Sequence, residues 1–457
     1  MIKKNIQYSY YIIAIGGFLT GYLTSVIAGV LPFMATEFSL STTQEGLVSS
    51  IVLFGGILGA LFGGQFANVV GRKKAMMLFA LICTIGVLGA SLLNQIALIL
   101  VFRFIMGMAV GAMSGLVPIY LSELAPSTIR GQVASINSVL CTLGIFLSYV
   151  ANNVFFDSGN WRVMNLLSLI ACAILLLGFF IIPESPEWLL AKGKYEKARE
   201  ISLLIFGTQD QLNVTEKEAI KEEETDTPIK EKYQAWMMRP IMLCVYVVAF
   251  QKITGANSVL FYAPKILEAA GLPSKLASQS TLGIGLIMFG FTFVCQKLID
   301  KEGRKVLLLF GNLTMGVILL LLGIFTQVSS IPGFVLVILV FLFIASYATT
   351  WGVVPWVLLG EMLPMVVKGV GSSLATGSTW IADAVITLMF PILLNLIHIN
   401  NIFFIFGVLN ILSFFFVRKF ITETKGKTQT EISAEEKQRW ELKHKLTITE
   451  NQPVKEK

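Results

Sequence analysis

The chain has 457 residues, of which 55% are hydrophobic and only 14% charged, and its mean hydropathy is +0.75. Soluble domains carry about 25% charged residues, so this composition excludes an ordinary soluble protein and indicates a membrane protein. The net charge of +7 does not indicate nucleic-acid binding, because the basic residues follow a pattern typical of membrane topology.

Twelve apolar stretches are long enough to cross a bilayer, which takes about 20 residues each. Backbone polar groups find no water in lipid, so each stretch is expected to be a helix. The sequence therefore predicts an all-α membrane protein with twelve transmembrane helices. The predicted spans are 9–34, 45–68, 75–95, 97–121, 131–151, 161–183, 236–262, 277–298, 305–327, 332–359, 370–394 and 399–421.

A polar stretch separates these spans into two sets of six. We expect an N-terminal six-helix bundle (1–183), a cytoplasmic linker with short amphipathic helices (184–235), a C-terminal six-helix bundle (236–421) and a cytoplasmic tail (422–457). The first apolar run is too long for a signal core and lacks a small-residue cleavage site, which favours a retained first helix.

Basic residues gather in the loops on one side of the predicted spans. They include Lys3, Lys4, Arg72, Lys73, Lys74, Arg130, Arg304, Lys305, Lys368 and the tail after Arg418, whereas the opposite loops hold mainly Arg162, Lys265 and Lys275. This positive-inside pattern predicts that both termini are cytoplasmic. It also makes membrane lipids, and not nucleic acid, the expected partner of the basic charge. A short first outer loop without a glycosylation sequon favours a bacterial inner membrane.

Three short motifs occur twice, at nearly equal spacing. The segments starting at Glu123 and Glu361 lie 238 residues apart, and Gly71-Arg-Lys and Gly303-Arg-Lys lie 232 apart. The third pair, centred on Glu184 and Glu423, lies 239 apart. Repetition of three motifs indicates an internal duplication. In a membrane protein, duplicated halves are typical of a transporter whose binding site lies between them.

The duplicated motifs place glutamates beside basic residues at the predicted span ends. One exposed ion pair contributes only about 0–1 kcal/mol, but several that close in one conformation can bias a two-state equilibrium. We expect a network within and between the halves that forms an inner gate; the alternative is that these charges only set topology. The residues assigned to this gate are Arg72, Glu123, Arg130, Glu184, Asp300, Arg304, Glu361, Lys368 and Glu423.

From about residue 10 to 430 the motifs resemble the sugar-porter family of the major facilitator superfamily. The resemblance is carried by Pro118-Ile-Tyr-Leu-Ser-Glu-Leu-Ala-Pro126, Pro183-Glu-Ser-Pro186, Gln251 to Tyr262, Trp351 to Trp356 and Glu423-Thr-Lys-Gly426. It implies the major facilitator fold, with two pseudo-symmetric six-helix bundles that alternate access to a central site. It also implies that the inner gate holds the outward-open state together. Asn68 and Val69 replace the acid and base expected there.

The resemblance further implies which residues line the solute site. They are Ser138, Gln251, Lys252, Asn257, Tyr262, Trp356, Trp380 and Asp383. Aromatic rings suit the apolar face of a sugar ring. The chain departs from similar sugar carriers at four positions: Lys252 and Ser138 replace glutamines, Asp383 replaces an asparagine, and Leu23 replaces the aspartate of proton-coupled members.

These departures leave several interpretations open. Charges at bilayer depth are costly and demand a partner or a function. Lys252 and Asp383 can form a structural ion pair, or Asp383 can serve as the proton-binding carboxylate for symport, with Lys252 tuning it. Alternatively, Lys252 and Arg103 make the cavity electropositive and select a small organic anion such as a sugar acid. Uncoupled facilitation is also open, because animal glucose facilitators lack the first-helix acid as well.

Other chemistry is not indicated. The five cysteines all fall within predicted spans, which suits apolar packing better than a disulfide framework. No metal-ligand cluster, phosphate loop or nucleophile–base pair stands out, so we expect no cofactor, no metal and no enzymatic activity. The sequence predicts a monomeric secondary transporter of a monosaccharide or polyol, with protons as a second possible partner. A non-transporting sugar sensor is a remote alternative.

Overall fold

The computed structural model describes residues 2–126, 129–206, 234–269, 271–328 and 331–450, and all the regular structure in these ranges is helical. The membrane-type helices of the first part are α1 (Ile2–Ser25), α2 (Ile27–Glu37), α3 (Thr42–Val70), α4 (Arg72–Leu92), α5 (Ile96–Leu124), α6 (Arg130–Val154), α7 (Trp161–Leu166) and α8 (Ser168–Leu177). Those of the second part are α13 (Met238–Ile253), α14 (Ala256–Ala269), α15 (Ser274–Glu302), α16 (Arg304–Phe325), α17 (Gly333–Thr349), α18 (Val354–Met362) and α19 (Lys368–Phe420).

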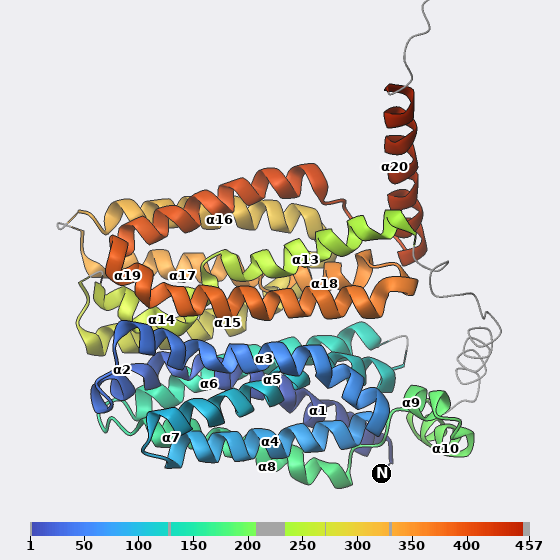
Figure 1. Ribbon diagram of the computed structural model, residues 1–457, viewed down its shortest axis with the longest axis horizontal. Helices are drawn as coiled ribbons and strands as arrows, with labels where there is room; N and C mark the ends of the chain where they lie inside the picture. Colours follow the sequence, from blue (N-terminus) through green and yellow to red (C-terminus); the bar gives the residue numbers. More distant parts are fainter. Residues whose placement is uncertain (1, 127–128, 207–233, 270, 329–330, 451–457) are drawn as a thin grey trace, which may run out of the picture.

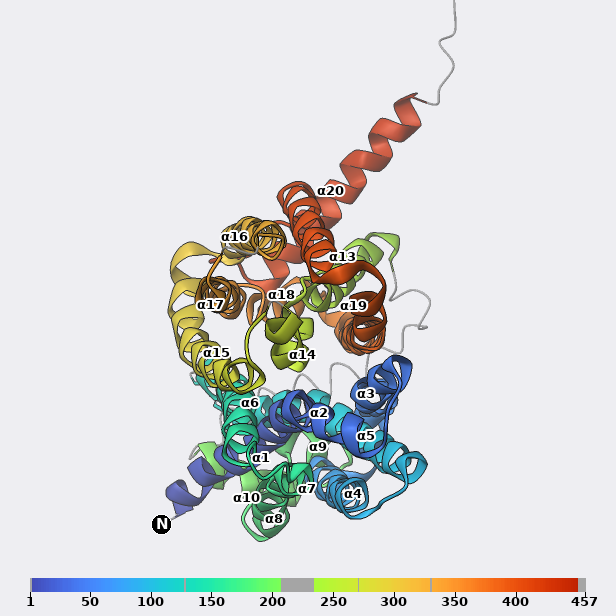
Figure 2. The same cartoon turned by 90° about the vertical axis from the view of Figure 1, so that its left-hand side faces the viewer.

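These helices form two groups that lie side by side with a common long axis (Figure 1). We call α1 to α8 the N half and α13 to α19 the C half. Seen from one end of the bundle, the two halves face each other across a seam (Figure 2). Two short helices, α9 (Pro186–Ala191) and α10 (Tyr195–Phe206), follow the N half, and the remaining linker residues 207–233 lie outside the described part of the chain.

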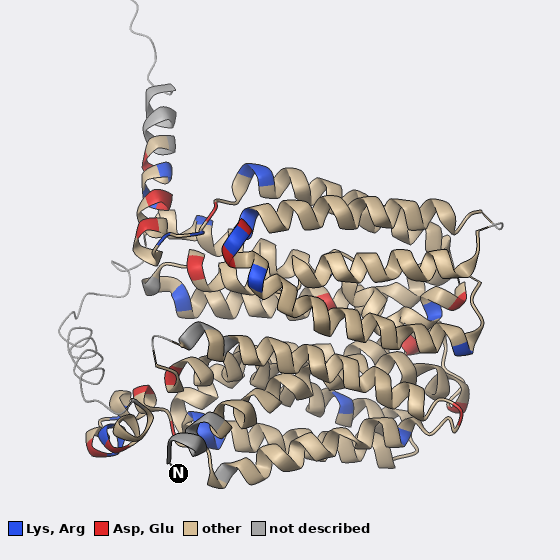
Figure 3. Ribbon diagram, turned by 180° about the vertical axis from the view of Figure 1, so that it is seen from behind, with Lys and Arg blue, Asp and Glu red and all other residues tan. Residues whose placement is uncertain are grey.

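The two ends of the bundle differ in charge. Lysine, arginine, aspartate and glutamate gather at the end that also carries α9, α10 and the tail helix α20 (Gln429–Glu450) (Figure 3). We call this the charged end. The other end, with the connecting residues 38–41, 155–160 and 271–273, is the short-loop end.

The expected all-α membrane fold is confirmed, whereas the number of crossings stays a prediction. Among the described residues, nine helices are long and apolar enough to cross a membrane, or ten if the bent pair α1–α2 forms one span. Trp161–Leu177 is shorter, and α19 has 53 residues with a non-helical backbone at His398. A helix of this length extends roughly 80 Å, more than twice the hydrocarbon thickness of about 30 Å. If α19 crosses the membrane twice and Trp161–Leu177 crosses it once, the ten candidate spans become the twelve that the sequence predicts.

Helix breaks shape the middle of the C half. Gly255 separates α13 from α14 with φ of +92°, a conformation that glycine adopts without penalty. Thr350 to Val353 interrupt the neighbouring pair α17 and α18, and Pro355 lies in the first turn of the new helix, which begins at Val354. Such breaks expose backbone groups that must find partners away from lipid. Most candidate solute-binding residues of the C half lie next to them.

Candidate functional site

A buried carboxylate lies at the centre of the candidate site. Asp383 of α19 accepts hydrogen bonds from Asn257 Nδ2 at 2.7 Å (Oδ1) and 2.8 Å (Oδ2). Lys252 Nζ lies 3.3 Å from Oδ2, so the same carboxylate also forms an ion pair. Asn257 follows the Gly255 break, and Lys252 occupies the last turn before it. The break therefore brings two consecutive helices onto one acidic side chain.

Gln251 connects the two broken helix pairs. Its Nε2 donates to the carbonyl oxygens of Trp351 (2.6 Å) and Gly352 (3.0 Å), in the interruption between α17 and α18. Its Oε1 is buried and has no hydrogen-bond partner among the described residues. A buried acceptor without a hydrogen-bond partner is costly. This oxygen is therefore suited to accept a hydrogen bond from a hydroxyl group of a solute.

The aromatic candidates lie on different surfaces. Trp380, one turn before Asp383, is buried and packs against Gly56 of α3, across the seam between the halves. Trp356 is 42% exposed. Tyr262 donates from its hydroxyl to Thr387 O at 2.9 Å and stacks on Phe390. Tyr262 therefore connects α14 to α19, one turn beyond Asp383 towards the short-loop end.

The N half contributes α6 to the other side of the site. Ser138 is half-buried, and Cys141, one turn later, lies within electrostatic range of Lys252. Asn137 Oδ1 is buried and has no hydrogen-bond partner among the described residues. We did not assign Asn137 or Cys141 to the candidate site from the sequence. Cys141 lies one helical turn after Ser138, which was the signal available for it, and Asn137 precedes Ser138 where similar sugar carriers also have an asparagine.

Arg103 belongs to a different environment from the one expected for a coupling residue. Its side chain is 1% exposed, and its Nε donates to Val48 O of α3 at 3.0 Å. It forms no ion pair with a described residue, and the structure does not bring it into contact with Lys252 or Asp383. Its electrostatic neighbour in the C half is Tyr262.

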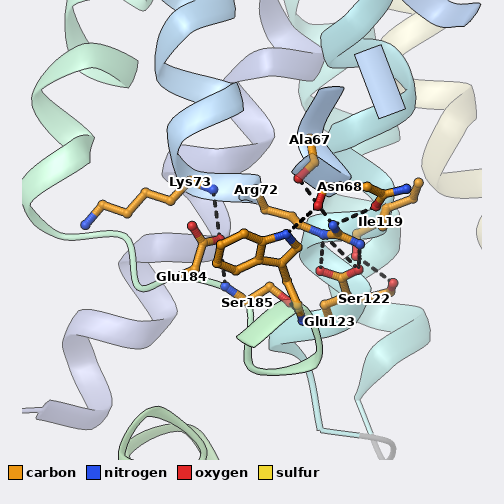
Figure 4. Close-up of polar contacts among 10 residues, drawn as sticks. Ala67, Asn68, Arg72, Lys73, Ile119, Ser122, Glu123, Glu184 and Ser185 are labelled. Atoms are coloured by element: carbon orange, nitrogen blue, oxygen red, sulfur yellow. Dashed lines mark hydrogen bonds and ion pairs between the residues drawn. The ribbon is translucent and has the colours of Figure 1, made fainter. Parts of the chain in front are cut away.

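At the charged end of the N half, a single arginine joins three helices (Figure 4). Arg72 contacts Glu123 through Nε at 3.0 Å and Nη2 at 2.9 Å, and its Nη1 donates to Asn68 Oδ1 at 2.7 Å. Glu184 accepts a hydrogen bond from the backbone N–H of Lys73 at 3.0 Å. The carboxylate of Glu184 thus caps the N-terminus of α4, where negative charge is favoured.

The C half repeats this arrangement. Arg304 contacts Glu361 at 2.8 Å and the exposed Asp300 at 3.4 Å. Glu423 accepts from the backbone N–H groups of Arg304 (2.9 Å) and Lys305 (3.0 Å), and so caps α16 as Glu184 caps α4. The two helices begin after glycines with positive φ, +104° at Gly71 and +97° at Gly303.

Among the described residues, each of the two charged-end networks lies within one half. We expected links within and between the halves, but every described ion pair between membrane-type helices at the charged end joins residues of one half. Lys368 forms no ion pair with a described residue, and the side chain of Arg130 lies outside the described part.

The polar contacts between the halves lie towards the short-loop end. Glu45 of α3 pairs with Lys265 of α14. The hydroxyl of Tyr149 in α6 donates to Leu260 O at 2.6 Å. Asn153 of the same helix donates to Ser278 O at 3.1 Å. The seam is therefore fastened on the short-loop side of the candidate site.

Comparison with known proteins agrees with this geometry. The profile of the family "Sugar (and other) transporter" matches residues 10–435. The chain is 39% identical to the putative metabolite transport protein YwtG of Bacillus subtilis, over 94% of this chain and 95% of that protein. It is 35% identical to a D-xylose transporter of Levilactobacillus brevis, over 95% and 96% of the two chains.

Among solved structures, the chain is similar to the inward-open conformation of the xylose transporter XylE from Escherichia coli. The TM-score is 0.81 at 27% identity, and the match covers 94% of this chain and 99% of that one. The sequence-based resemblance is thus confirmed by profile, relatives and fold together: the chain belongs to the sugar (and other) transporter family.

Proposed function

We propose that this protein is a secondary transporter that moves a neutral monosaccharide or polyol across the cytoplasmic membrane by alternating access. The proposal is carried by the cluster of Lys252, Asn257 and Asp383, which lies at helix breaks in the C half and faces α6 of the N half. A site between two pseudo-symmetric halves is the arrangement that alternating access requires. The similar XylE is described as a proton:xylose symporter.

The cluster offers a polyol a set of exchangeable hydrogen bonds. Asn257 and Lys252 donate to Asp383 in the present structure, and solute hydroxyl groups can take over either side of these contacts. Gln251 Oε1 supplies an acceptor that has no described partner. Trp380, buried across the seam, provides an apolar ring surface next to these polar groups.

A neutral solute fits this cluster better than an organic anion. The positive charge of Lys252 is already matched by Asp383 at 3.3 Å. Arg103, the second cation of the anion hypothesis, contacts Val48 O instead. An anion would have to break the pair and leave Asp383 without its counter-ion, whereas a polyol only exchanges hydrogen bonds.

The orientation of the protein in the membrane follows from its basic residues, and its conformation follows from the polar contacts between the two halves. Basic residues concentrate at the charged end, and the positive-inside rule assigns this end, with both termini, to the cytoplasm. The halves are fastened towards the short-loop end. The structure then represents an inward-facing state, in agreement with its similarity to inward-open XylE. Both sides of the site come from one chain, so a monomer is sufficient.

We further assign proton coupling to Asp383. It is a buried carboxylate in contact with the proposed solute-binding amide, and Leu23 leaves the first helix without an acid. Protonation removes the counter-ion of Lys252 and frees this side chain for the solute or water. Binding of the proton and binding of the solute are thereby coupled. Together they shift the populations of the inward-facing and outward-facing states.

The test is uptake by proteoliposomes of labelled hexoses, pentoses, inositol and sugar acids, with and without an inward proton gradient. We expect accumulation of a neutral solute that the gradient drives and that Asp383→Asn abolishes, while that variant still exchanges solute at equilibrium. Equilibration without accumulation in the wild type would identify an uncoupled facilitator. Transport confined to sugar acids, and lost in Lys252→Gln, would favour the anion carrier.

A further inference from the structure

The tail helix α20 consists of two parts of opposite charge. Residues 429–436 contain three glutamates and no lysine or arginine. Residues 437–445, Lys-Gln-Arg-Trp-Glu-Leu-Lys-His-Lys, contain four lysines or arginines and one glutamate. A single helix with its acids at one end and its bases at the other can contact two different partners.

The acidic part is seated on the C half. Ile432 is 3% exposed, and the side chain of Glu436 is 2% exposed and forms an ion pair with Arg239 in the first turn of α13. Gln429 donates from Nε2 to Leu363 O at the end of α18. The protein itself is therefore the partner of the acidic part.

The basic part leaves the protein surface. Lys437 and Arg439 are exposed and form no ion pair with a described residue, and Leu442 is 55% exposed. Figure 1 shows α20 running across the charged end at a steep angle to the bundle helices, and in Figure 2 its far end extends beyond the outline of the C half. Because the bundle helices cross the bilayer, α20 runs along the membrane surface, and its basic part reaches beyond the protein.

We propose that the basic part of α20 binds anionic phospholipid headgroups of the leaflet at the charged end. A cluster of lysine and arginine residues close to the membrane surface is attracted by the negative potential of an anionic leaflet. Lys437 and Arg439 are exposed members of this cluster, and Trp440 beside them packs partly against the bundle. Each basic side chain near an anionic surface strengthens binding about fivefold.

The proposal can be tested by hydrogen–deuterium exchange of the full chain in lipid nanodiscs. One set of discs contains phosphatidylcholine alone, and the other contains about 30% phosphatidylglycerol. We expect peptides that cover residues 437–450 to exchange several-fold more slowly in the anionic discs. The difference should disappear at high salt, because charges at the surface are then screened.

The double variant Lys437→Gln/Arg439→Gln should lose this protection. Lys301→Gln is the matched control, because Lys301 is exposed at the same end but lies on α15, and it should keep the protection. Equal exchange in both kinds of disc, or protection that survives the double variant, would overturn the proposal. Protection that requires two chains per disc would overturn it in favour of a contact between copies.

Discussion

Glu45 of α3 and Lys265 of α14 form an ion pair that joins the two halves near the short-loop end. Their side chains are 14% and 25% exposed, so the pair is largely shielded from solvent. Lys265 lies on the same short helix as Asn257, two turns further from the Gly255 break. One helix, α14, therefore carries both a contact that holds the two halves together and a residue of the proposed solute site.

Breaking this pair should shift the protein towards the state that is open at the short-loop end. Glu45→Gln removes a partly shielded charge pair, for which we expect about 1 kcal/mol, or a roughly fivefold change in the ratio of the two states. The distance between spin labels at Ser158 and Glu268, in a cysteine-free background, reports the change. The charge-reversed pair Glu45→Lys/Lys265→Glu should restore the original distribution. If Glu45→Gln leaves the distances unchanged, the pair does not hold the seam.

Removal of one partner of the Lys252–Asp383 pair should cost more than removal of both. Lys252→Gln leaves a buried carboxylate with only amide partners. A fully buried pair broken in this way costs about 3–5 kcal/mol, and we expect about 2 kcal/mol here because the Lys252 side chain is 19% exposed. Thermal unfolding in detergent should show a lower Tm for Lys252→Gln and recovery in Lys252→Gln/Asp383→Asn. A double variant less stable than either single variant would contradict a direct charge pairing.

The glycines before α4 and α16 should not tolerate a side chain. Gly71→Ala and Gly303→Ala each place a Cβ on extended backbone with positive φ, a region nearly confined to glycine, which costs about 1–3 kcal/mol. The added atom would also lie 2.4 Å from Glu184 Oε2 or 2.7 Å from Glu423 Oε2, and would push the capping carboxylate away. We expect a lower Tm for both variants. Gly64→Ala is the control: this position is helical and has no atom within 4 Å of the added Cβ, so its Tm should stay the same or rise.

Cys141 should report on occupancy of the site. It is half-buried on α6 within electrostatic range of Lys252, whereas the other four cysteines are buried. We expect a small maleimide to modify Cys141 first, and the transported solute to slow this reaction several-fold. Mass spectrometry of the labelled chain measures both effects, and Cys141→Ser should abolish the fast labelling. If a saturating concentration of solute leaves the labelling rate of Cys141 unchanged, Cys141 lies outside the solute path.

The sequence predicted the helical fold and the repeated networks because both rest on local patterns. Hydropathy indicated apolar membrane helices, and the duplicated motifs indicated that Arg72 and Arg304 are equivalent residues. The pair of Glu45 and Lys265 lies outside any motif and 220 residues apart in the chain. Only the packing of the two halves brings it together, so composition and spacing gave no sign of it.

The same limit applies within the site. Lys252 and Asp383 stood out because charge inside a span is rare. Cys141 did not, because a cysteine in a span is ordinary. The surroundings of Arg103 were also beyond sequence reasoning, because its donor group meets a backbone oxygen of the neighbouring helix, and no side-chain motif marks such a contact.

The repeated carboxylate caps also bear on how such a chain can arise. Each half satisfies N–H groups at the start of one of its helices with its own glutamate, Glu184 for α4 and Glu423 for α16. A half-length ancestor with one such network would already have had a helix N-terminus whose N–H groups were capped, before any fusion of two copies. Joining two such copies would then require no new capping residue at either helix, and residues elsewhere in each copy could change. Lys252 and Asp383 both belong to the second half, so the charged pair at the candidate site departs from the symmetry that the two capped helices keep.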